Sequence, residues 1–143
     1  MLLRASIGRS EALTEMQRHS KSVNDTYGHD VGDAALKVFS SVCGENLRDR
    51  DVLGRFGGEE FLLVLPGAPV SSLDAVFERP RAGLRAAIVP GMPLDARLSF
   101  SMGAASLETG ATIEQAIHRA DEALYRAKAN GRDRLIVASP APL

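Results

Sequence analysis

The segment GRFGGEEFLLVLPG, residues 54–67, constrains the fold most strongly, because two glycines and two glutamates separate two apolar runs. The runs are VLGRF (52–56) and FLLVLP (61–66), and both have the length and apolar content of β-strands. Gly57 and Gly58 adopt positive φ at little cost, as a two-residue turn requires. The segment therefore predicts an antiparallel hairpin that carries Glu59 and Glu60 at its tip.

Periodicity of the apolar residues predicts the remaining elements. Apolar residues at helical spacing or in alternation predict helices over residues 30–48, 71–89 and 112–131, and strands over residues 97–107 and 134–137. Pro80 removes a backbone donor and clashes with the preceding turn, so a break in the second helix is expected there. Interleaved helices and strands with a hairpin predict an α/β fold, an α+β sandwich whose mainly antiparallel central sheet is flanked by helices.

Composition limits the class of protein. A chain of 143 residues with 45% hydrophobic residues fits one globular domain with its own core. The formal net charge of -1 gives no broad basic field, so nucleic acid is not an expected partner. We see no apolar run of about 18 residues and no signal-peptide pattern, so we expect no membrane segment and a cytoplasmic location. The single cysteine, Cys43, lies on an apolar helix stripe and is expected in the core.

The paired glutamates at the hairpin tip have two interpretations. Adjacent carboxylates that enter an apolar strand repel each other and resist desolvation. A divalent cation would relieve both costs, since Mg²⁺ prefers carboxylate oxygens and shares its other positions with water and phosphates. The alternative is a solvated hairpin end that is simply acidic. Local chemistry alone leaves both interpretations open.

A second polar stretch, KSVNDTYGHDVGDAAL (21–36), leads into the first predicted helix. Its carboxylates are typical helix caps, worth about 1 kcal/mol each. An amide and a carboxylate held near each other also match the edge of guanine, because Asp accepts from N1–H and the exocyclic amine while Asn donates or accepts. Capping and guanine recognition both remain possible on this pattern.

Three motifs in order give the chain a resemblance to a known family. SVNDTYGHDVGD, RFGGEEFLLVLPG and ADEALYRAKANGRDRL resemble the GGDEF family of diguanylate cyclases, from Lys21 to about Val137. The resemblance implies a fold akin to nucleotidyl-cyclase and polymerase palm domains. It also implies condensation of two GTP molecules into cyclic di-GMP across a homodimer, with Mg²⁺ or Mn²⁺ as cofactor and pyrophosphate released.

The resemblance also implies the roles of individual residues. Glu59 would be a metal ligand, and Glu60 would be needed for catalysis. The residues that would contact GTP are Gly57 and Gly58 through their backbone, Asn24 and Asp33 at guanine, and Lys128 and Arg132 at the phosphates. Without the resemblance, Lys128 and Arg132 would be interpreted as solvated surface.

A product-binding site is the second site that the resemblance implies. The sequence RDRD (48–51) has Arg48 and Asp51 at the family's R-x-x-D spacing, directly before the hairpin. Arginine presents a planar fork to phosphate or guanine, and aspartate accepts from guanine N–H groups. The resemblance thus implies inhibition by cyclic di-GMP at Arg48 and Asp51. The alternative is an exposed charged turn.

The N-terminal segment departs from the family pattern. Met16, Arg18 and Ser20 stand where the family's D-x-D-x-F strand motif would precede Lys21. We therefore expect an atypical or truncated segment over residues 1–20, a GGDEF domain over 21–138 and a frayed tail over 139–143. A metal-binding aspartate and a central strand should be missing, and turnover of this chain should be low. The alternative function is a catalytically impaired module that binds GTP or cyclic di-GMP as a sensor.

Overall fold

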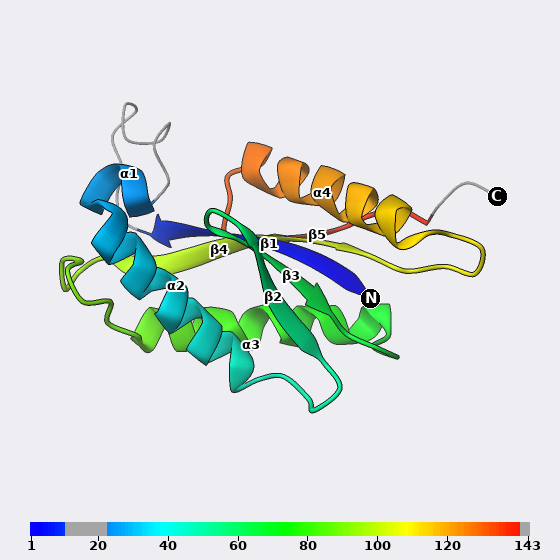
Figure 1. The fold of residues 1–143 in the computed structure, drawn as a ribbon, viewed down its shortest axis with the longest axis horizontal. Coiled ribbons are helices and arrows are strands. Elements are labelled where there is room, and N and C mark those ends of the chain that lie inside the picture. Colours follow the sequence, from blue (N-terminus) through cyan, green and yellow to red (C-terminus); the bar gives the residue numbers. More distant parts are fainter. Residues whose placement is uncertain (11–22, 141–143) are drawn as a thin grey trace.

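A computed structural model describes residues 1–10 and 23–140, with the side chains of residues 7–10 outside the description (Figure 1). Residues Met16, Arg18 and Ser20, on which the departure from the family pattern depends, lie outside the described ranges. The elements in chain order are β1 (Leu2–Ser10), α1 (Val23–Tyr27), α2 (His29–Gly44), β2 (Val52–Gly57), β3 (Glu60–Val64), a 3₁₀ turn η2 (Val70–Ser72), α3 (Leu73–Ala86), β4 (Arg97–Ala105), α4 (Ile113–Ala129) and β5 (Leu135–Val137).

The strands form one sheet in the order β2-β3-β1-β4-β5. Its neighbours pair antiparallel except β4 and β5, which are parallel. Helix α4 covers one face of the sheet, and α2 and α3 cover the other (Figure 1). The predicted α+β sandwich with a mainly antiparallel central sheet is confirmed.

Strand β1 corrects the expectation that a central strand is missing. Residues 2–10 pair with β3 on one side and with β4 on the other, so the N-terminal residues fill the centre of the sheet. Leu3 and Ala5 point into the core and are fully buried. The strand forms without the family's motif, because alternate residues suit the two buried faces of a central strand and both its edges find ladder partners.

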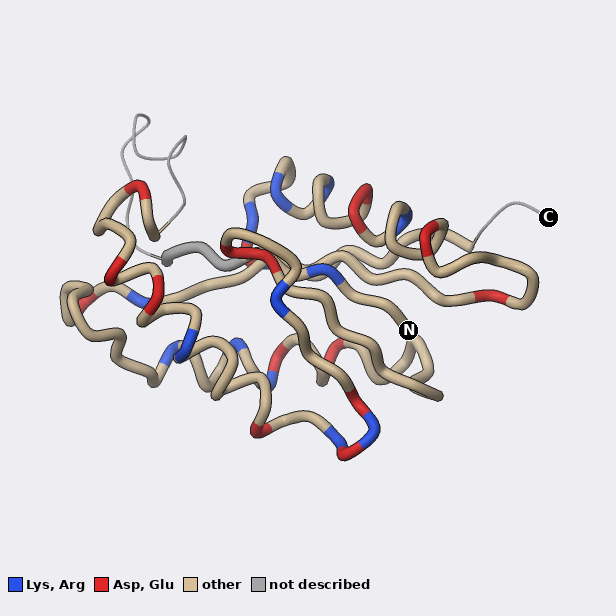
Figure 2. The backbone as a smooth tube through the Cα atoms, in the orientation of Figure 1, with Lys and Arg blue, Asp and Glu red and all other residues tan. Residues whose placement is uncertain are grey.

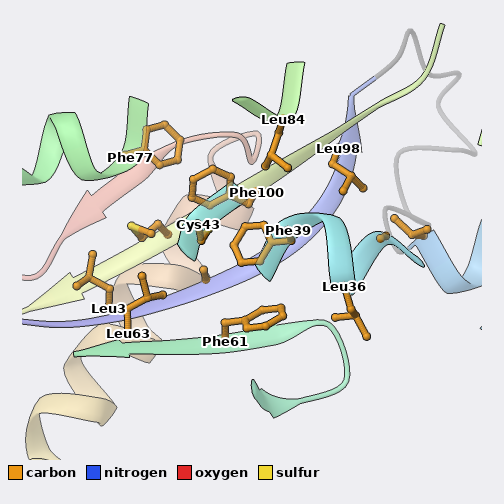
Figure 3. Packing of buried hydrophobic residues seen from close by; sticks show 14 of the residues in the cluster. Leu3, Leu36, Phe39, Cys43, Phe61, Leu63, Phe77, Leu84, Leu98 and Phe100 are labelled. Atoms are coloured by element: carbon orange, nitrogen blue, oxygen red, sulfur yellow. The ribbon is translucent and has the colours of Figure 1, made fainter. Parts of the chain in front are cut away.

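The main core lies between the sheet and helices α2 and α3 (Figure 3). Phe39 of α2 packs against Phe61 of β3 with ring centroids 4.8 Å apart and against Phe100 of β4 at 5.3 Å. Phe77 of α3 meets Phe100 at 4.8 Å. These tilted and edge-on arrangements are the favourable ones for aromatic pairs. Cys43 is buried at 2% exposure in the same cluster, which confirms its predicted place in the core.

Helix α4 packs closely on the sheet, because small residues line the contact. Its inward residues are Ala116, Ala120, Ala123 and Ala127, all fully buried. A Cβ atom on Gly103 of β4 would overlap the backbone of α4 at Ala120 and Leu124. The start of the helix is fixed by a capping box between Thr112 and Gln115. Close packing fixes the height of α4 above the sheet and so places its polar side chains.

The predicted break at Pro80 is wrong, because α3 continues through it from Leu73 to Ala86. Proline in a helix interior loses one backbone hydrogen bond and costs about 3 kcal/mol. Here Pro80 is itself buried, and Phe77 and Leu84 on the same helix bury their side chains in the core. Burial of this face offsets the lost hydrogen bond, so tertiary packing prevails over local preference.

Candidate functional site

The predicted β2–β3 hairpin forms, but its turn lies one residue later than the predicted Gly57-Gly58, after a register shift between Arg55 and Gly57. Gly57 pairs with Glu60, which leaves Gly58 and Glu59 as the two turn residues. Gly58 has φ 54°, a left-handed conformation that glycine adopts without strain. Arg55 donates from Nε to the carbonyl oxygen of Gly58 at 3.0 Å and braces the turn. The two glutamates therefore have a fixed place at one end of the sheet.

Glu59 joins the hairpin tip to the segment predicted to recognise guanine. The backbone N–H of Asn24, on α1, donates to Glu59 Oε1 at 3.0 Å. These residues are 35 positions apart in the sequence. The structure therefore brings together two motifs that sequence analysis could connect only through a family resemblance.

Glu60 is held between two cationic side chains. Arg4 of β1 donates from Nη2 to Glu60 Oε2 at 2.5 Å. Lys128, near the end of α4, donates from Nζ to Glu60 Oε1 at 3.0 Å. The predicted phosphate-binding Lys128 thus lies at the hairpin tip, although its side chain is engaged with a carboxylate. Each oxygen of Glu60 faces one positive charge.

Asn24, predicted to recognise guanine together with Asp33, lies against the residue that precedes Asp33 in the sequence. The Asn24 side chain packs on the backbone of Gly32, the residue before Asp33, and a Cβ on Gly32 would overlap the Asn24 amide oxygen. This oxygen is buried and has no hydrogen-bond partner within the described part of the chain. Asp33 is exposed on α2. Gly32 therefore leaves the space that the Asn24 amide occupies, and Asp33 presents its carboxylate to solvent.

Arg132 lies in a strained turn directly after α4. Gly131, Arg132 and Asp133 all have positive φ, at 113°, 64° and 47°. A left-handed conformation costs a residue other than glycine about 1 kcal/mol or more. Arg81 of α3 holds the turn with a bidentate pair to Asp133, at 3.0 Å from Nε and 2.8 Å from Nη2. The partly desolvated position of Arg132 lowers the pKa of its guanidinium.

Arg48 and Asp51 form a separate charged cluster at the other end of the hairpin (Figure 2). Asp51 accepts from the Arg48 backbone N–H at 2.8 Å and from its Nη2 at 2.8 Å. Arg48 Nη2 also donates to the Pro66 carbonyl oxygen at 3.0 Å. Hydrogen bonding from Arg48 is the largest cause that holds the pKa of Asp51 below its usual value. The two predicted residues meet, and they are paired with each other.

A cavity of about 270 Å³ lies beside this cluster, between α2, α3 and the sheet. Its walls are mostly apolar and include Leu63, Leu65 and Met102, while Arg48, Asp51 and Arg79 add charge. Arg79 of α3 was not singled out by sequence analysis. Its place on the wall makes it a third charged residue near the predicted product site.

Of the two glutamates at the hairpin tip, only Glu59 suits a divalent cation. Within residues 1–10 and 23–140, no cluster of three or more His, Cys, Asp or Glu side chains is arranged to hold a metal ion. Glu60 does not fit, because cationic side chains meet both of its oxygens. Glu59 can offer one carboxylate, and Mg²⁺ commonly binds through one or two carboxylates plus the phosphates of a nucleotide. The arrangement fits a cation that arrives with a nucleotide.

Sequence analysis missed the residues that hold the site together. Two sets of ion pairs position the predicted residues: Arg4 with Glu60 and Asp121, and Arg81 with Asp133. Each of these ion pairs joins residues that are far apart in the sequence. For Arg4, the sequence signal was the position of a charged residue within an otherwise apolar N-terminal run. Ion pairs between residues 52 or 56 positions apart produce no periodic pattern in the sequence.

Comparisons with known proteins support one family. A family profile described as "Diguanylate cyclase, GGDEF domain" matches residues 13–134. Diguanylate cyclase DgcP of Pseudomonas aeruginosa is 41% identical over 122 residues, which cover 84% of this chain and 18% of that protein. Probable diguanylate cyclase DgcC of Escherichia coli is 40% identical over 122 residues, or 85% of this chain and 33% of that protein.

Solved structures agree with the sequence comparisons. The active GGEEF domain of a diguanylate cyclase from Vibrio cholerae has a TM-score of 0.73 and 30% identity, and the match covers 98% of this chain and 84% of that one. The GGDEF domain of DgcB from Caulobacter crescentus, in complex with c-di-GMP, has a TM-score of 0.72 and 25% identity, with 95% and 77% covered. The chain spans about a fifth to a third of the length of the curated relatives named above.

Proposed function

Because the chain belongs to the GGDEF family of diguanylate cyclases, we propose that its domain condenses two GTP molecules into cyclic di-GMP with release of pyrophosphate. The observation that carries the proposal is the convergence on the hairpin tip. Glu59 contacts the start of α1, where Asn24 lies, and Glu60 contacts Lys128 at the end of α4. Residues proposed for base recognition, for catalysis and for phosphate binding thus meet at one turn, namely Asn24, Glu59, Glu60 and Lys128.

Guanine would be read by Asn24 and Asp33. The exposed carboxylate of Asp33 accepts from guanine N1–H and the exocyclic amine, and the amide of Asn24 supplies a second polar contact. Adenine reverses the donor and acceptor at that edge, so ATP leaves a polar group unpaired. We expect GTP to bind more tightly than ATP by about 1–3 kcal/mol.

The triphosphate would lie over the hairpin tip. Gly57 and Gly58 have no side chains, and a Cβ atom at either would meet no heavy atom within 4 Å, so the backbone is open to a ligand. Lys128 supplies positive charge at the tip, and Arg132, in the turn after α4, would be the second phosphate-binding residue. A phosphate would compete with Glu60 for Lys128.

Cation chemistry in this domain would depend on Glu59. GGDEF cyclases generally use a divalent metal, and we propose that Mg²⁺ or Mn²⁺ is held here by Glu59 and the nucleotide. When bound, such a cation lowers the pKa of the attacking 3′-hydroxyl and stabilises charge on the leaving group. Glu60, fixed by Arg4 and Lys128, keeps the hairpin tip in register with α4.

Catalysis across a homodimer and inhibition by product complete the proposal. One GTP per protomer implies that two hairpin tips face each other. Cyclic di-GMP would bind at Arg48 and Asp51, with Arg79 as a third contact from the same cavity wall. Replacement of Arg48 by Ala should weaken cyclic di-GMP binding about tenfold or more, the effect of losing a charge-assisted hydrogen bond.

Product formation tests the proposal. The chain is incubated with GTP and Mg²⁺, cyclic di-GMP is quantified by mass spectrometry, and the Glu59→Ala variant serves as the blank. Strand β1 fills the centre of the sheet, so a missing central strand is no longer a reason to expect poor turnover. The lack of the family's D-x-D-x-F motif before Lys21 is still such a reason. We therefore expect slow product formation that requires Glu59. GTP binding without product would instead favour the sensor function.

A further inference from the structure

Arg4 is a charged residue in the middle of a central strand. Its side chain is 4% exposed and lies on the face of the sheet that α4 covers, opposite Leu62 of β3 and Gly103 of β4. A guanidinium ion that has lost its water requires counter-charges and polarisable neighbours. The described structure supplies both.

Three elements provide these contacts to Arg4. Nη2 donates to Glu60 Oε2 at the hairpin tip at 2.5 Å. Nη1 forms an ion pair with Asp121 Oδ1 of α4 at 2.7 Å. The ring of Phe56, at the end of β2, stacks on the guanidinium with its centroid 4.0 Å from Cζ. Arg4 therefore ties β1, the hairpin and α4 to one positive charge.

We propose that Arg4 is a permanent counter-cation of the candidate site, which neutralises Glu60 and Asp121 and keeps a divalent cation from Glu60. The inference rests on the proposed function, because it concerns why the metal binds at Glu59 and not at Glu60. Lys128 Nζ lies 3.0 Å from the other oxygen of Glu60. A divalent cation at Glu60 would face two like charges at close range and would have to displace at least one of them.

The two glutamates at the hairpin tip accordingly have different tasks. Glu60 is a positioning residue whose charge is balanced by Arg4 and Lys128. Glu59, the metal ligand of the proposed function, receives the cation that the nucleotide carries, and the backbone N–H of Asn24 donates to its Oε1 at 3.0 Å. Adjacent residues of one type thereby avoid competition for the same ion.

Binding of Mn²⁺ alone tests the role of Arg4. Free Mn²⁺ is measured by electron paramagnetic resonance in titrations of the parent, Arg4→Gln and Arg4→Lys, each checked for folding by circular dichroism. Removal of the positive charge leaves Glu60 and Asp121 without their counter-ion, so Arg4→Gln should bind Mn²⁺ about tenfold more tightly or better. Arg4→Lys should resemble the parent. A folded Arg4→Gln variant with the affinity of the parent would overturn the proposal.

A second comparison leaves Arg4 in place and does not depend on the stability of Arg4→Gln. Binding of Mn²⁺ with a non-hydrolysable GTP analogue is measured for Glu59→Gln and Glu60→Gln. Affinity should fall about tenfold or more in Glu59→Gln and stay within about twofold of the parent in Glu60→Gln. Equal losses would overturn the division of tasks. Failure of the parent to bind the analogue would count against the proposed function, while the titrations with Mn²⁺ alone would still decide the role of Arg4.

Discussion

Gly103→Ala should separate α4 from the sheet, because the added Cβ has no space. It would overlap the carbonyl oxygen of Ala120 and the backbone nitrogen of Leu124, and it would lie 2.9 Å from the carbonyl carbon of Ala123. Carbon atoms in contact are normally about 3.5–4.0 Å apart, so the helix has to retreat by at least roughly 0.6 Å at its nearest carbon and further elsewhere. All three obstructing atoms belong to the backbone and cannot rotate away.

The expected cost lies at the upper end of the range for overpacked cores, about 3 kcal/mol in the free energy of unfolding. For a chain of this size this loss lowers the melting temperature by roughly 10 °C. Urea unfolding followed by circular dichroism measures the change. Gly54→Ala is the matched control, since a Cβ at Gly54 of β2 meets no heavy atom within 4 Å. We expect Gly54→Ala to change the free energy of unfolding by about 0.5 kcal/mol or less.

The result also bears on the candidate site, because α4 carries Asp121 and Lys128. A retreat of α4 should weaken their contacts with Arg4 and Glu60. If Gly103→Ala and Gly54→Ala unfold at the same urea concentration, the close approach of α4 to β4 does not determine stability, and our account of how the helix is positioned is wrong.

Three further predictions concern guanine recognition, the Arg48–Asp51 pair and Cys43. Gly32→Ala should push the Asn24 amide from its place and reduce the preference for GTP over ATP in calorimetric titrations, whereas unchanged discrimination would remove Asn24 from base recognition. The lowered pKa of Asp51 favours its charged form in the folded chain, so its contribution to stability is present above the ordinary aspartate pKa of about 3.9 and is lost as pH falls through the folded pKa. The difference in unfolding free energy between the parent and Asp51→Asn should therefore shrink below about pH 4, and a difference that stays constant from pH 7 to strong acid would contradict the pairing. Burial raises the pKa of Cys43 to about 12, so its thiol should react with Ellman's reagent at pH 8 only after urea unfolding, and rapid reaction of the native chain would contradict its burial.

Local signals explain which parts of the structure were predictable. The hairpin follows from apolar runs on either side of Gly57 and Gly58, and α4 follows from apolar residues at helical spacing. Both depend on residues that are neighbours in the sequence. The candidate residues at the hairpin tip were found for the same reason, since adjacent glutamates after two glycines are conspicuous.

Long-range contacts explain what could not be predicted. Strand β1 pairs with residues about 60 and 100 positions away in the sequence. Its own sequence contains no motif that predicts a central strand. Sequence analysis made no prediction for Arg4, because its charge is balanced by Glu60 and Asp121 from elements that only the fold brings near. Pro80 likewise predicted a break, and burial of α3 against the core overrode that preference.

Simultaneous measurement of cyclic di-GMP and pyrophosphate tests the central claim most directly. Condensation of two GTP molecules into a cyclic dinucleotide forms two phosphodiester bonds and releases one pyrophosphate with each. The account predicts two pyrophosphates for every cyclic di-GMP made by the parent chain with Mg²⁺, no orthophosphate, and neither product from Glu59→Ala. Release of orthophosphate and GDP, or GTP consumption that Glu59→Ala does not change, would contradict a diguanylate cyclase built on this hairpin tip.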